Sequence, residues 1–313
     1  MEQKINIPIV FAFDEKMEIP AGVCITSLLE SAEENTFYDI FILHPGRCDF
    51  SNSSILHLPE KYHNCRITFR SVGNQFASAF EIREITTATY YKLLIPDLIP
   101  EYDQVLYSDV DVIFREDQGK YLQGDMGQAL FAAVDSYGVL PEDDRAYVAG
   151  RLKLSGQDGF FYAGNLVINA KRLREEKKTS EFLQMAAQNR FRFQDMDILN
   201  LSCKGRILSL SPAFCLTCDL YDAMVANRGG IDVSPEEKHH ALAYGTVHYN
   251  GPKPWKENCL NMDLWWAVYR KSIFFEEKFA HSFWSDRRFS LEKLSLFKRI
   301  KLVARYFRKG GKI

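Results

Sequence analysis

The stretch Val105-Leu106-Tyr107-Ser108-Asp109-Val110-Asp111-Val112-Ile113-Phe114 decides the fold class of this 313-residue chain. A run rich in Val, Ile and aromatic residues is typical of a buried strand in an α/β sheet. Two carboxylates, Asp109 and Asp111, are set into this run two positions apart. Because positions i and i+2 of an extended backbone point to the same side, we expect the two side chains to form one anionic site.

Two neighbouring carboxylates inside an apolar strand need a counter-charge, because like charges buried side by side repel each other. Mg²⁺ or Mn²⁺ would supply it, since these hard cations bind through one or two protein carboxylates together with substrate phosphates. The pattern therefore predicts a metal and diphosphate site at a strand end. Asp-x-Asp is a common tripeptide, so a strand that ends at a solvated polar turn explains these residues alone equally well.

The segments around this stretch alternate between predicted strands and helices. Strands are predicted over residues 7–13, 38–43, 66–70 and 129–134, and helices over 20–34 and 86–94, the second closed by Pro96 and Pro100. This alternation predicts a doubly wound, largely parallel sheet, whose ligands bind beyond the carboxyl ends of its strands. Four acids follow predicted strands and are expected at that edge: Asp14, Asp109, Asp111 and Asp135.

Composition narrows the classes of protein. A 46% share of hydrophobic residues is enough for a sizeable core, so the chain is not expected to be disordered. The formal net charge of −2 gives no overall basic field, which argues against nucleic acid as a partner. The sequence has neither a Gly-x-Gly-x-x-Gly segment opening a helix nor a Walker-type phosphate loop, so a Rossmann dehydrogenase or a P-loop enzyme is not expected.

The cysteines and the N-terminus bear on the compartment. The seven cysteines are scattered, and the single Cys-x-x-Cys pair, Cys215 and Cys218, has no second pair to complete a zinc site. Free thiols in a reducing compartment are therefore predicted. The N-terminus lacks the apolar segment of a signal peptide, and no run of 18 apolar residues occurs. We expect a cytoplasmic protein, either free or peripheral on the cytoplasmic face of a membrane.

Five segments within residues 7–260 together resemble glycosyltransferase family 8, whose members are retaining, nucleotide-sugar-dependent enzymes of the GT-A fold. Bacterial members that build lipopolysaccharide or capsule are the most similar in pattern. The segments are Val10-Phe11-Ala12-Phe13-Asp14, Thr89-Tyr90-Tyr91-Lys92-Leu93-Leu94, Leu106-Tyr107-Ser108-Asp109-Val110-Asp111-Val112, Asn165-Leu166-Val167-Ile168-Asn169 and His248-Tyr249-Asn250-Gly251-Pro252-Lys253-Pro254-Trp255. The resemblance implies an α/β GT-A fold: a doubly wound, mostly parallel sheet with a small antiparallel portion and a helical C-terminal tail. It also implies a GT-A domain over residues 1–265. Charge and helical periodicity, not the resemblance, predict a helical basic region over residues 266–313 that could anchor the protein to a membrane surface.

The resemblance also assigns the site. It implies that Asp109, Asp111 and His248 hold Mn²⁺, with Mg²⁺ as the alternative, against the diphosphate of a UDP-sugar donor. Within the donor site, Asp14 would contact the uridine and Asp135 the sugar hydroxyls. Lys92 stands where many members have Arg, which keeps the charge but loses the bidentate geometry. The donor-binding residues implied in this way are Ala12, Asp14, Lys92, Ser108, Val110, Asp135, Ala163, Gly251 and Lys253.

Two positions depart from the family pattern. The family motif Asp-Gln-Asp is replaced by Asp195-Met196-Asp197, and a thioether is only a weak hydrogen-bond acceptor. Tyr162 stands where the family has an Asn before Ala/Ser-Gly. Both positions are expected near the transferred sugar. They indicate an altered sugar or acceptor, a changed detail of the mechanism, or reduced activity.

Three functions remain open from these residues. The main hypothesis is a Mn²⁺-dependent retaining enzyme that moves a hexose from UDP-galactose or UDP-glucose to a glycan acceptor such as lipopolysaccharide or capsule. The acceptor would attack from the face that UDP leaves, or through a short-lived enzyme-linked species formed on Asp197 with support from Asp195. A catalytically weakened nucleotide-sugar or glycan-binding protein is the alternative. A metal-dependent nucleotidyltransferase or hydrolase fits the Asp-x-Asp and fits the segment 248–255 poorly.

The end of the chain carries a separate signal. Residues 286–313 contain ten Lys or Arg and two acids. Apolar residues recur there at helical spacing, at Leu296, Ile300, Val303 and Phe307. A basic amphipathic helix of this kind predicts binding to an anionic membrane surface, which suits a lipid-linked acceptor. A packed C-terminal helix with a solvated basic face is the alternative.

Overall fold

The computed structural model describes residues 4–73, 76, 87–227, 231, 233–292 and 295–308, without the side chains of 286–292, 302 and 305–308. Its centre is a seven-stranded sheet in the order β3-β2-β1-β4-β7-β6-β8. The pairs from β3 to β4 are parallel, and β7 runs antiparallel to both of its neighbours. The predicted mixed sheet is therefore confirmed. The strands are β1 (Ile5–Ala12), β2 (Thr36–His44), β3 (Cys65–Ser71), β4 (Val105–Ser108), β6 (Phe131–Ala133), β7 (Asn165–Ile168) and β8 (Ile207–Ser209).

A second, three-stranded sheet is built from β5 (Val112–Ile113), β10 (Val247–His248) and β9 (Leu216–Thr217). The stretch from Val105 to Phe114, predicted as one strand, is thus divided between two sheets. The division lies at the two acids: the amide of Asp109 donates to Gly164 O (2.7 Å), and the carbonyl of Asp111 accepts from Tyr249 N (2.9 Å). The small sheet brings β10 beside the carboxylates.

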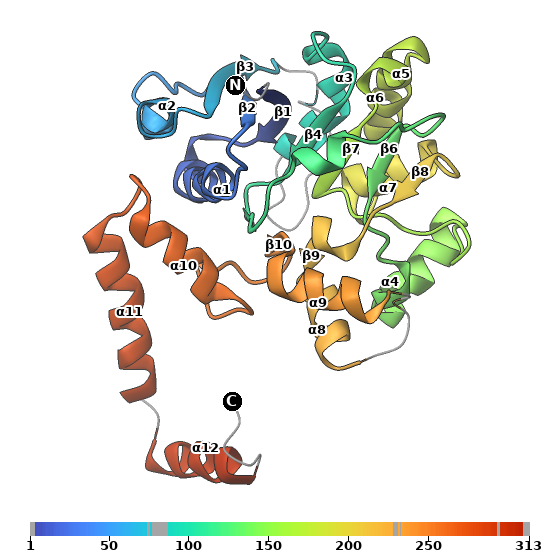
Figure 1. Ribbon diagram of the computed structural model, residues 1–313. Helices are drawn as coiled ribbons and strands as arrows, with labels where there is room; N and C mark the ends of the chain where they lie inside the picture. The colour runs from blue at the N-terminus through green and yellow to red at the C-terminus, as the bar shows by residue number, and fades with distance from the viewer. Residues whose placement is uncertain are drawn as a thin grey trace.

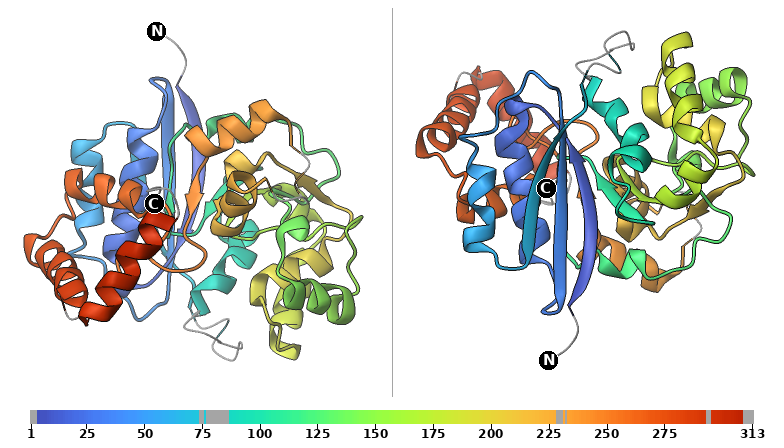
Figure 2. Two further views of the ribbon diagram at one scale, coloured as in Figure 1. Left: turned by 90° about the horizontal axis from the view of Figure 1, so that it is seen from below. Right: turned by 90° about the horizontal axis from the view of Figure 1, so that it is seen from above.

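Helices cover both faces of the large sheet. Figure 2 shows α1 and α10 on one side and α3, α5, α6 and α7 on the other. The α-helices are α1 (Glu18–Glu30), α2 (Leu58–Lys61), α3 (Ile95–Leu98), α4 (Glu142–Tyr147), α5 (Ala170–Glu175), α6 (Lys178–Gln188), α7 (Gln194–Ser202), α8 (Cys218–Val225), α9 (Pro235–Tyr244), α10 (Met262–Lys271), α11 (Glu277–Glu292) and α12 (Leu296–Arg308). The 3₁₀ helices include η1 (Glu15–Met17) and η3 (Thr87–Leu94).

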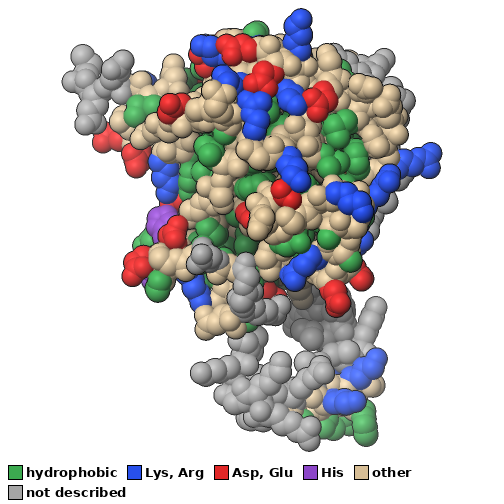
Figure 3. All heavy atoms as spheres, turned by 90° about the vertical axis from the view of Figure 1, so that its right-hand side faces the viewer, with side chains coloured by type: hydrophobic (Ala, Val, Ile, Leu, Met, Phe, Trp, Pro, Cys, Tyr) green, Lys and Arg blue, Asp and Glu red, His purple; other side chains and the backbone are tan. Residues whose placement is uncertain are grey.

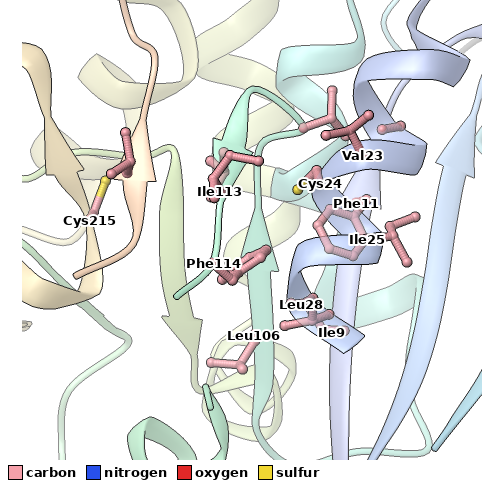
Figure 4. Packing of buried hydrophobic residues seen from close by; sticks show 14 of the residues in the cluster. Ile9, Phe11, Val23, Cys24, Ile25, Leu28, Leu106, Ile113, Phe114 and Cys215 are labelled. Atoms are coloured by element: carbon pink, nitrogen blue, oxygen red, sulfur yellow. The ribbon is translucent and has the colours of Figure 1, made fainter. Parts of the chain in front are cut away.

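Strand residues alternate between two hydrophobic clusters, one on each face of the sheet. Ile9 and Phe11 of β1 belong to the cluster that includes α1, whereas Val10 belongs to the cluster on the other face. Figure 4 shows the first cluster, with Leu28 of α1 and Leu106 of β4 close to Ile9. This alternation places Tyr107 on the opposite face from Leu106.

The helix predicted over residues 86–94 is not an α-helix. Residues Thr87–Leu94 form the 3₁₀ helix η3, and residue 86 lies outside the described residues. The α-helix α3 follows at once, with Pro96 in its first turn, so this proline begins a helix rather than closing one. The first turn of a helix has no use for the N–H that proline lacks, which explains its place there.

The C-terminal helices differ in how they pack. Trp265, Trp266 and Tyr269 of α10 and Phe283 of α11 are buried in the main core cluster, so the boundary predicted between residues 265 and 266 falls inside a packed helix. Figure 1 shows α12 projecting from the body at the end of α11. Within the described part of the chain, no helix is both long and apolar enough to cross a bilayer.

Candidate metal and donor site

The predicted acids meet at one edge of the large sheet. Strands β1, β4 and β6 run in the same direction, because β7 is antiparallel to both β4 and β6. Asp14 follows β1, Asp109 follows β4 and Asp135 follows β6. Asp14 accepts from Lys16 N (3.1 Å), and Asp135 accepts from the amides of Tyr137 and Phe160 (both 2.9 Å), so each also shapes the loop that it begins.

Asp109, Asp111 and His248 form a compact group. His248 Nε2 lies 3.2 Å from Asp111 Oδ1 and 3.8 Å from Asp109 Oδ2. One ligand atom from each residue lies within 4.8 Å of the other two. The small sheet positions the histidine: His248 of β10 pairs with Val112 of β5, the residue after Asp111. Two carboxylates and an imidazole at this spacing are a donor set that fits a divalent cation.

Gly164 gives these ligands room to converge. A Cβ atom at this position would lie 2.2 Å from Cε1 of His248 and 3.1 Å from Oδ2 of Asp109. The first contact is shorter than any real one and the second is unusually tight, so any other residue would displace the histidine ring and press on the carboxylate. Sequence reasoning did not assign Gly164 a role. The signals for one were its place as the glycine of the family's Ala/Ser-Gly pair and its position just before the strand that pairs with β4.

Two basic side chains, Lys253 and His248, contact the carboxylate of Asp111. Lys253 Nζ lies 2.5 Å from Asp111 Oδ2 and 2.6 Å from the carbonyl of Tyr249. Burial alone would raise the pKa of Asp111, but His248 and Lys253 hold it well below its usual value. Burial alone would lower the pKa of His248, and Asp111 outweighs that effect and raises it well above the usual value. The carboxylate is therefore ionised at neutral pH and able to bind a cation.

Lys92 is buried beside the group. Its ammonium contacts Asp195 Oδ2 (2.8 Å), the carbonyl of Ala163 (2.8 Å) and Asp109 Oδ1 (3.4 Å). It also lies 4.5 Å from the ring centre of Tyr107, whose hydroxyl donates to Asp109 Oδ1 (2.6 Å). Burial would lower the pKa of Lys92, but the two carboxylates raise it above its usual value. Lys92 therefore links an acid after β4 to an acid on α7.

The two acids of α7 have different surroundings. Asp195 accepts from Thr89 Oγ1 (2.7 Å) and from Lys92, so it is joined to the group around Asp109. Asp197 is fully buried and accepts from the hydroxyl of Tyr147 (2.6 Å) and the amide of Phe193 (3.1 Å). Its Oδ1 atom has no hydrogen-bond partner among the described residues. Burial raises the pKa of Asp197 to about 6.

The remaining predicted positions lie around these residues. Ala12 ends β1, Val110 is buried between the two acids, and Ser108 donates to the carbonyl of Asp109 (2.8 Å). Gly251 is exposed in the loop after β10. Tyr162, at the position where an Asn was expected, is buried in the main core cluster, where its hydroxyl interacts with Thr217.

Residues 8–259 match the family model described as glycosyl transferase family 8. The chain belongs to this family. A lipopolysaccharide 1,2-glucosyltransferase of Escherichia coli is 24% identical over 276 residues, which are 85% of this chain and 75% of that protein. The crystal structure of the galactosyltransferase LgtC with donor and acceptor sugar analogues has a TM-score of 0.71 and 24% identity, over 88% of this chain and 99% of LgtC. The apo structure of the bifunctional glycosyltransferase WbbM has a TM-score of 0.67 and 23% identity. The matched part is 88% of this chain but only 51% of WbbM.

The family match shows that the chain is a glycosyltransferase. The likeness to LgtC confirms the GT-A fold expected from the sequence. At this level of identity the structural likeness carries no information about the sugar or the acceptor.

Proposed function

We propose that this glycosyltransferase moves a hexose from a UDP-sugar, UDP-galactose or UDP-glucose, to a glycan acceptor with retention of configuration. The observation that carries the proposal is the convergence of Asp109, Asp111 and His248 at the carboxyl edge of the sheet. An acceptor in lipopolysaccharide or capsule is favoured by the Escherichia coli relative, which is named as a lipopolysaccharide glucosyltransferase.

Mn²⁺ is the cation that we propose for these ligands, with Mg²⁺ as the alternative. Carboxylate oxygens and an imidazole nitrogen suit both ions, and the missing side chain at Gly164 lets the His248 ring lie close to the two carboxylates. When bound, the cation would offset the charge that develops on the departing UDP. Lys253 adds a second positive charge at the same carboxylate and can turn toward a diphosphate, because its long side chain is flexible.

The other donor contacts are proposed from their positions around the metal ligands. Asp14 would bind the uridine and Asp135 the hydroxyls of the sugar. Ala12, Ser108, Val110, Ala163 and Gly251 would contact the donor through backbone or small side chains. For Lys92 we propose an indirect role, because its ammonium already contacts Asp109, Asp195 and a backbone carbonyl.

Retention requires attack from the face that UDP leaves or two successive displacements. For the second route we propose Asp197 as the carboxylate that forms the enzyme-linked species, supported by Asp195. The Oδ1 atom of Asp197 has no hydrogen-bond partner among the described residues, and its helix α7 also carries Asp195, which Lys92 links to Asp109. Asp195 is held in place by Lys92 and Thr89.

The competing function is a binding protein that has lost the ability to transfer sugar. Met196 and Tyr162, which depart from the family pattern, support it. The double variant Asp109→Ala, Asp111→Ala separates the two. An enzyme loses Mn²⁺ binding and UDP-sugar turnover together, whereas a glycan-binding scaffold keeps its effect in a cellular assay of surface glycan. Asp103→Ala is the matched control, because Asp103 is an exposed acid outside the site. Unchanged turnover in the double variant would contradict the proposed site.

We also propose that the enzyme works at the cytoplasmic face of a membrane and binds anionic lipid through α12. The apolar side chains of Leu296, Phe297, Ile300 and Val303 are between 55% and 83% exposed. Lys298, Arg299 and Lys301 are exposed on the same helix. Figure 3 shows apolar and basic side chains together on the part of α12 that it colours. Exposed apolar and basic side chains on one helix favour a lipid surface over a packed helix.

A further inference from the structure

Cys215 lies directly behind the histidine of the metal group. Its sulfur is 3.5 Å from His248 Nδ1, and its side chain is fully buried. Cys215 precedes β9, which pairs in parallel with β10, so that Leu216 lies opposite Val247 and Thr217 opposite His248. Figure 4 shows Cys215 on the far side of Ile113 and Phe114 from α1, at the edge of the core next to the small sheet.

The two nitrogens of His248 have different neighbours. Nε2 faces the carboxylates of Asp109 and Asp111, so this nitrogen must offer its lone pair if the group binds a cation. A neutral imidazole that uses the Nε2 lone pair carries its hydrogen on Nδ1. The atom that Nδ1 meets is the sulfur of Cys215.

We propose that Cys215 is a positioning residue for His248: its sulfur accepts the hydrogen bond from Nδ1–H and thereby fixes the tautomer and the ring orientation that aim Nε2 at the carboxylates. The inference rests on the proposed function, because it concerns the same metal group. Metal-binding histidines generally donate their second N–H to a partner, and loss of that partner typically costs 10–100-fold in metal affinity.

The fit of the ring supports an orienting role. A Cβ atom at Gly164 would lie 2.8 Å from Nδ1 of His248, so the ring lies tightly against this glycine. Cys215 Sγ contacts the same nitrogen. A ring confined in this way has little freedom to rotate. When a cation replaces the proton on Nε2, the one remaining ring hydrogen is on Nδ1, where the sulfur of Cys215 can accept it.

A thiol also suits the charge of the site. Asp109 and Asp111 already place two carboxylates beside the ring. A carboxylate as the partner of Nδ1 would add a third negative charge in a buried environment, which is costly. A cysteine at this position adds no further carboxylate to the group. Because it is a weak acceptor, it orients the ring without binding it strongly.

The test compares three variants in the full-length protein. Cys215→Ala removes the acceptor, and Cys215→Ser replaces the sulfur with a hydroxyl that can accept the same hydrogen bond. Cys203→Ala is the matched control, because Cys203 is also fully buried but belongs to the cluster on the opposite face of the sheet. Mn²⁺ affinity is measured by electron paramagnetic resonance without donor, and far-UV circular dichroism checks that each variant is folded.

We expect Cys215→Ala to weaken Mn²⁺ binding about 10–100-fold, with Cys215→Ser within a few-fold of the unchanged protein and Cys203→Ala equal to it. In the Mg²⁺-loaded protein, ¹⁵N-edited NMR of histidine is expected to show a hydrogen-bonded Nδ1–H proton that is lost in Cys215→Ala and kept in Cys215→Ser. Equal Mn²⁺ affinity in Cys215→Ala, or equal losses in the Ala and Ser variants, would overturn the inference while the metal group stands. If the unchanged protein binds neither ion, the metal assignment itself fails, and this inference fails with it.

Discussion

The ammonium of Lys92 lies 2.8 Å from Oδ2 of Asp195, and only 2% of the lysine side chain and 8% of the aspartate side chain are exposed. The lysine comes from η3 and the aspartate from α7, which are about a hundred residues apart in the chain and are joined here beside the metal group. The same ammonium reaches Asp109. One buried cation therefore connects the proposed metal ligands with α7, the helix that carries Asp195 and Asp197.

Replacing Lys92 tests this link. Lys92→Met is expected to lower the free energy of unfolding by about 3–5 kcal/mol, because it leaves the buried carboxylate of Asp195 without its cation. Urea denaturation at pH 7 measures the change. Lys171→Met is the control, since Lys171 forms an exposed pair with Asp103, and such pairs contribute about 0–1 kcal/mol. A loss for Lys92→Met no larger than that of the control would show that the buried pair is not needed.

The raised pKa of Asp197 predicts a dependence of stability on pH. Its pKa is about 6 in the folded protein, against an ordinary value near 3.8. Between these two values the folded state holds a proton that the unfolded state has lost, so the contribution of Asp197 to stability falls as pH rises from about 4 to about 6 and is constant above. Asn cannot ionise, and Asp197→Asn is therefore expected to gain up to about 3 kcal/mol relative to the unchanged protein across this window.

Chemical denaturation of both proteins at pH 4.5 and pH 7 measures that difference, and the proposed function adds a second readout. If Asp197 forms the enzyme-linked species, the Asn variant is stable at pH 7 but has lost transfer. A variant with full activity would exclude Asp197 from the reaction, and a difference in stability that does not change with pH would contradict the raised pKa.

Gly164→Ala tests the space around the metal ligands. The added Cβ would meet His248 and Asp109, so we expect Mn²⁺ affinity to fall at least tenfold even where the protein stays folded. Titration of Mn²⁺ by electron paramagnetic resonance measures the affinity. Gly150→Ala is the matched control, because a Cβ there has no neighbour within 4 Å. Unchanged affinity in Gly164→Ala would mean that the ligands do not need to converge as closely as they do here.

The projecting helix α12 predicts binding to lipid. Full-length protein is expected to bind vesicles that contain anionic lipid and to be released as salt rises, because the attraction between basic side chains and anionic headgroups is screened. A chain that ends at Phe289 keeps Phe279, Phe283 and Trp284, which pack on α10, and should stay folded and bind UDP. Its activity should fall on membrane-embedded acceptors and hold on soluble ones.

Cosedimentation with vesicles at low and high salt tests this prediction, with Ile300→Glu as a variant that keeps the full length of the chain. Ile300 is 58% exposed, so a charge there should weaken vesicle binding without unfolding the protein. If the truncated chain unfolds, or if the full-length protein does not bind anionic vesicles at low salt, the tail belongs to the core. The proposed binding of α12 to lipid is then wrong.

Much of the fold could be predicted from local patterns. The apolar runs that became β1, β2, β3 and β6 were recognisable by composition, and the acids after β1, β4 and β6 indicated the edge of the sheet on which the site lies. The division of the stretch from Val105 to Phe114 could not be predicted, because it depends on partners far away in the chain: Gly164 bonds to Asp109, and Tyr249 bonds to Asp111.

The site shows the same limit. The Asp-x-Asp pair could be recognised in the sequence, because two carboxylates within an apolar run need a counter-charge. Cys215 and Gly164 were not recognisable in this way, since a single Cys-x-x-Cys pair and a glycine before a strand are ordinary in sequence, and their roles depend on distances to His248. Lys92 was expected to contact the donor, and only its position among two carboxylates and a carbonyl indicates a structural role.

The most direct test of the central claim, that Asp109, Asp111 and His248 hold a cation for transfer from a UDP-hexose, is the hydrolysis of a panel of UDP-sugars by the purified protein with and without Mn²⁺. Release of UDP is followed after removal of bound metal by chelation and again after Mn²⁺ is restored. We predict hydrolysis of UDP-galactose or UDP-glucose that disappears with the metal, returns with Mn²⁺ and is absent in Asp109→Ala, Asp111→Ala. A protein that neither binds UDP nor hydrolyses any UDP-hexose in the presence of Mn²⁺ would contradict the proposed function.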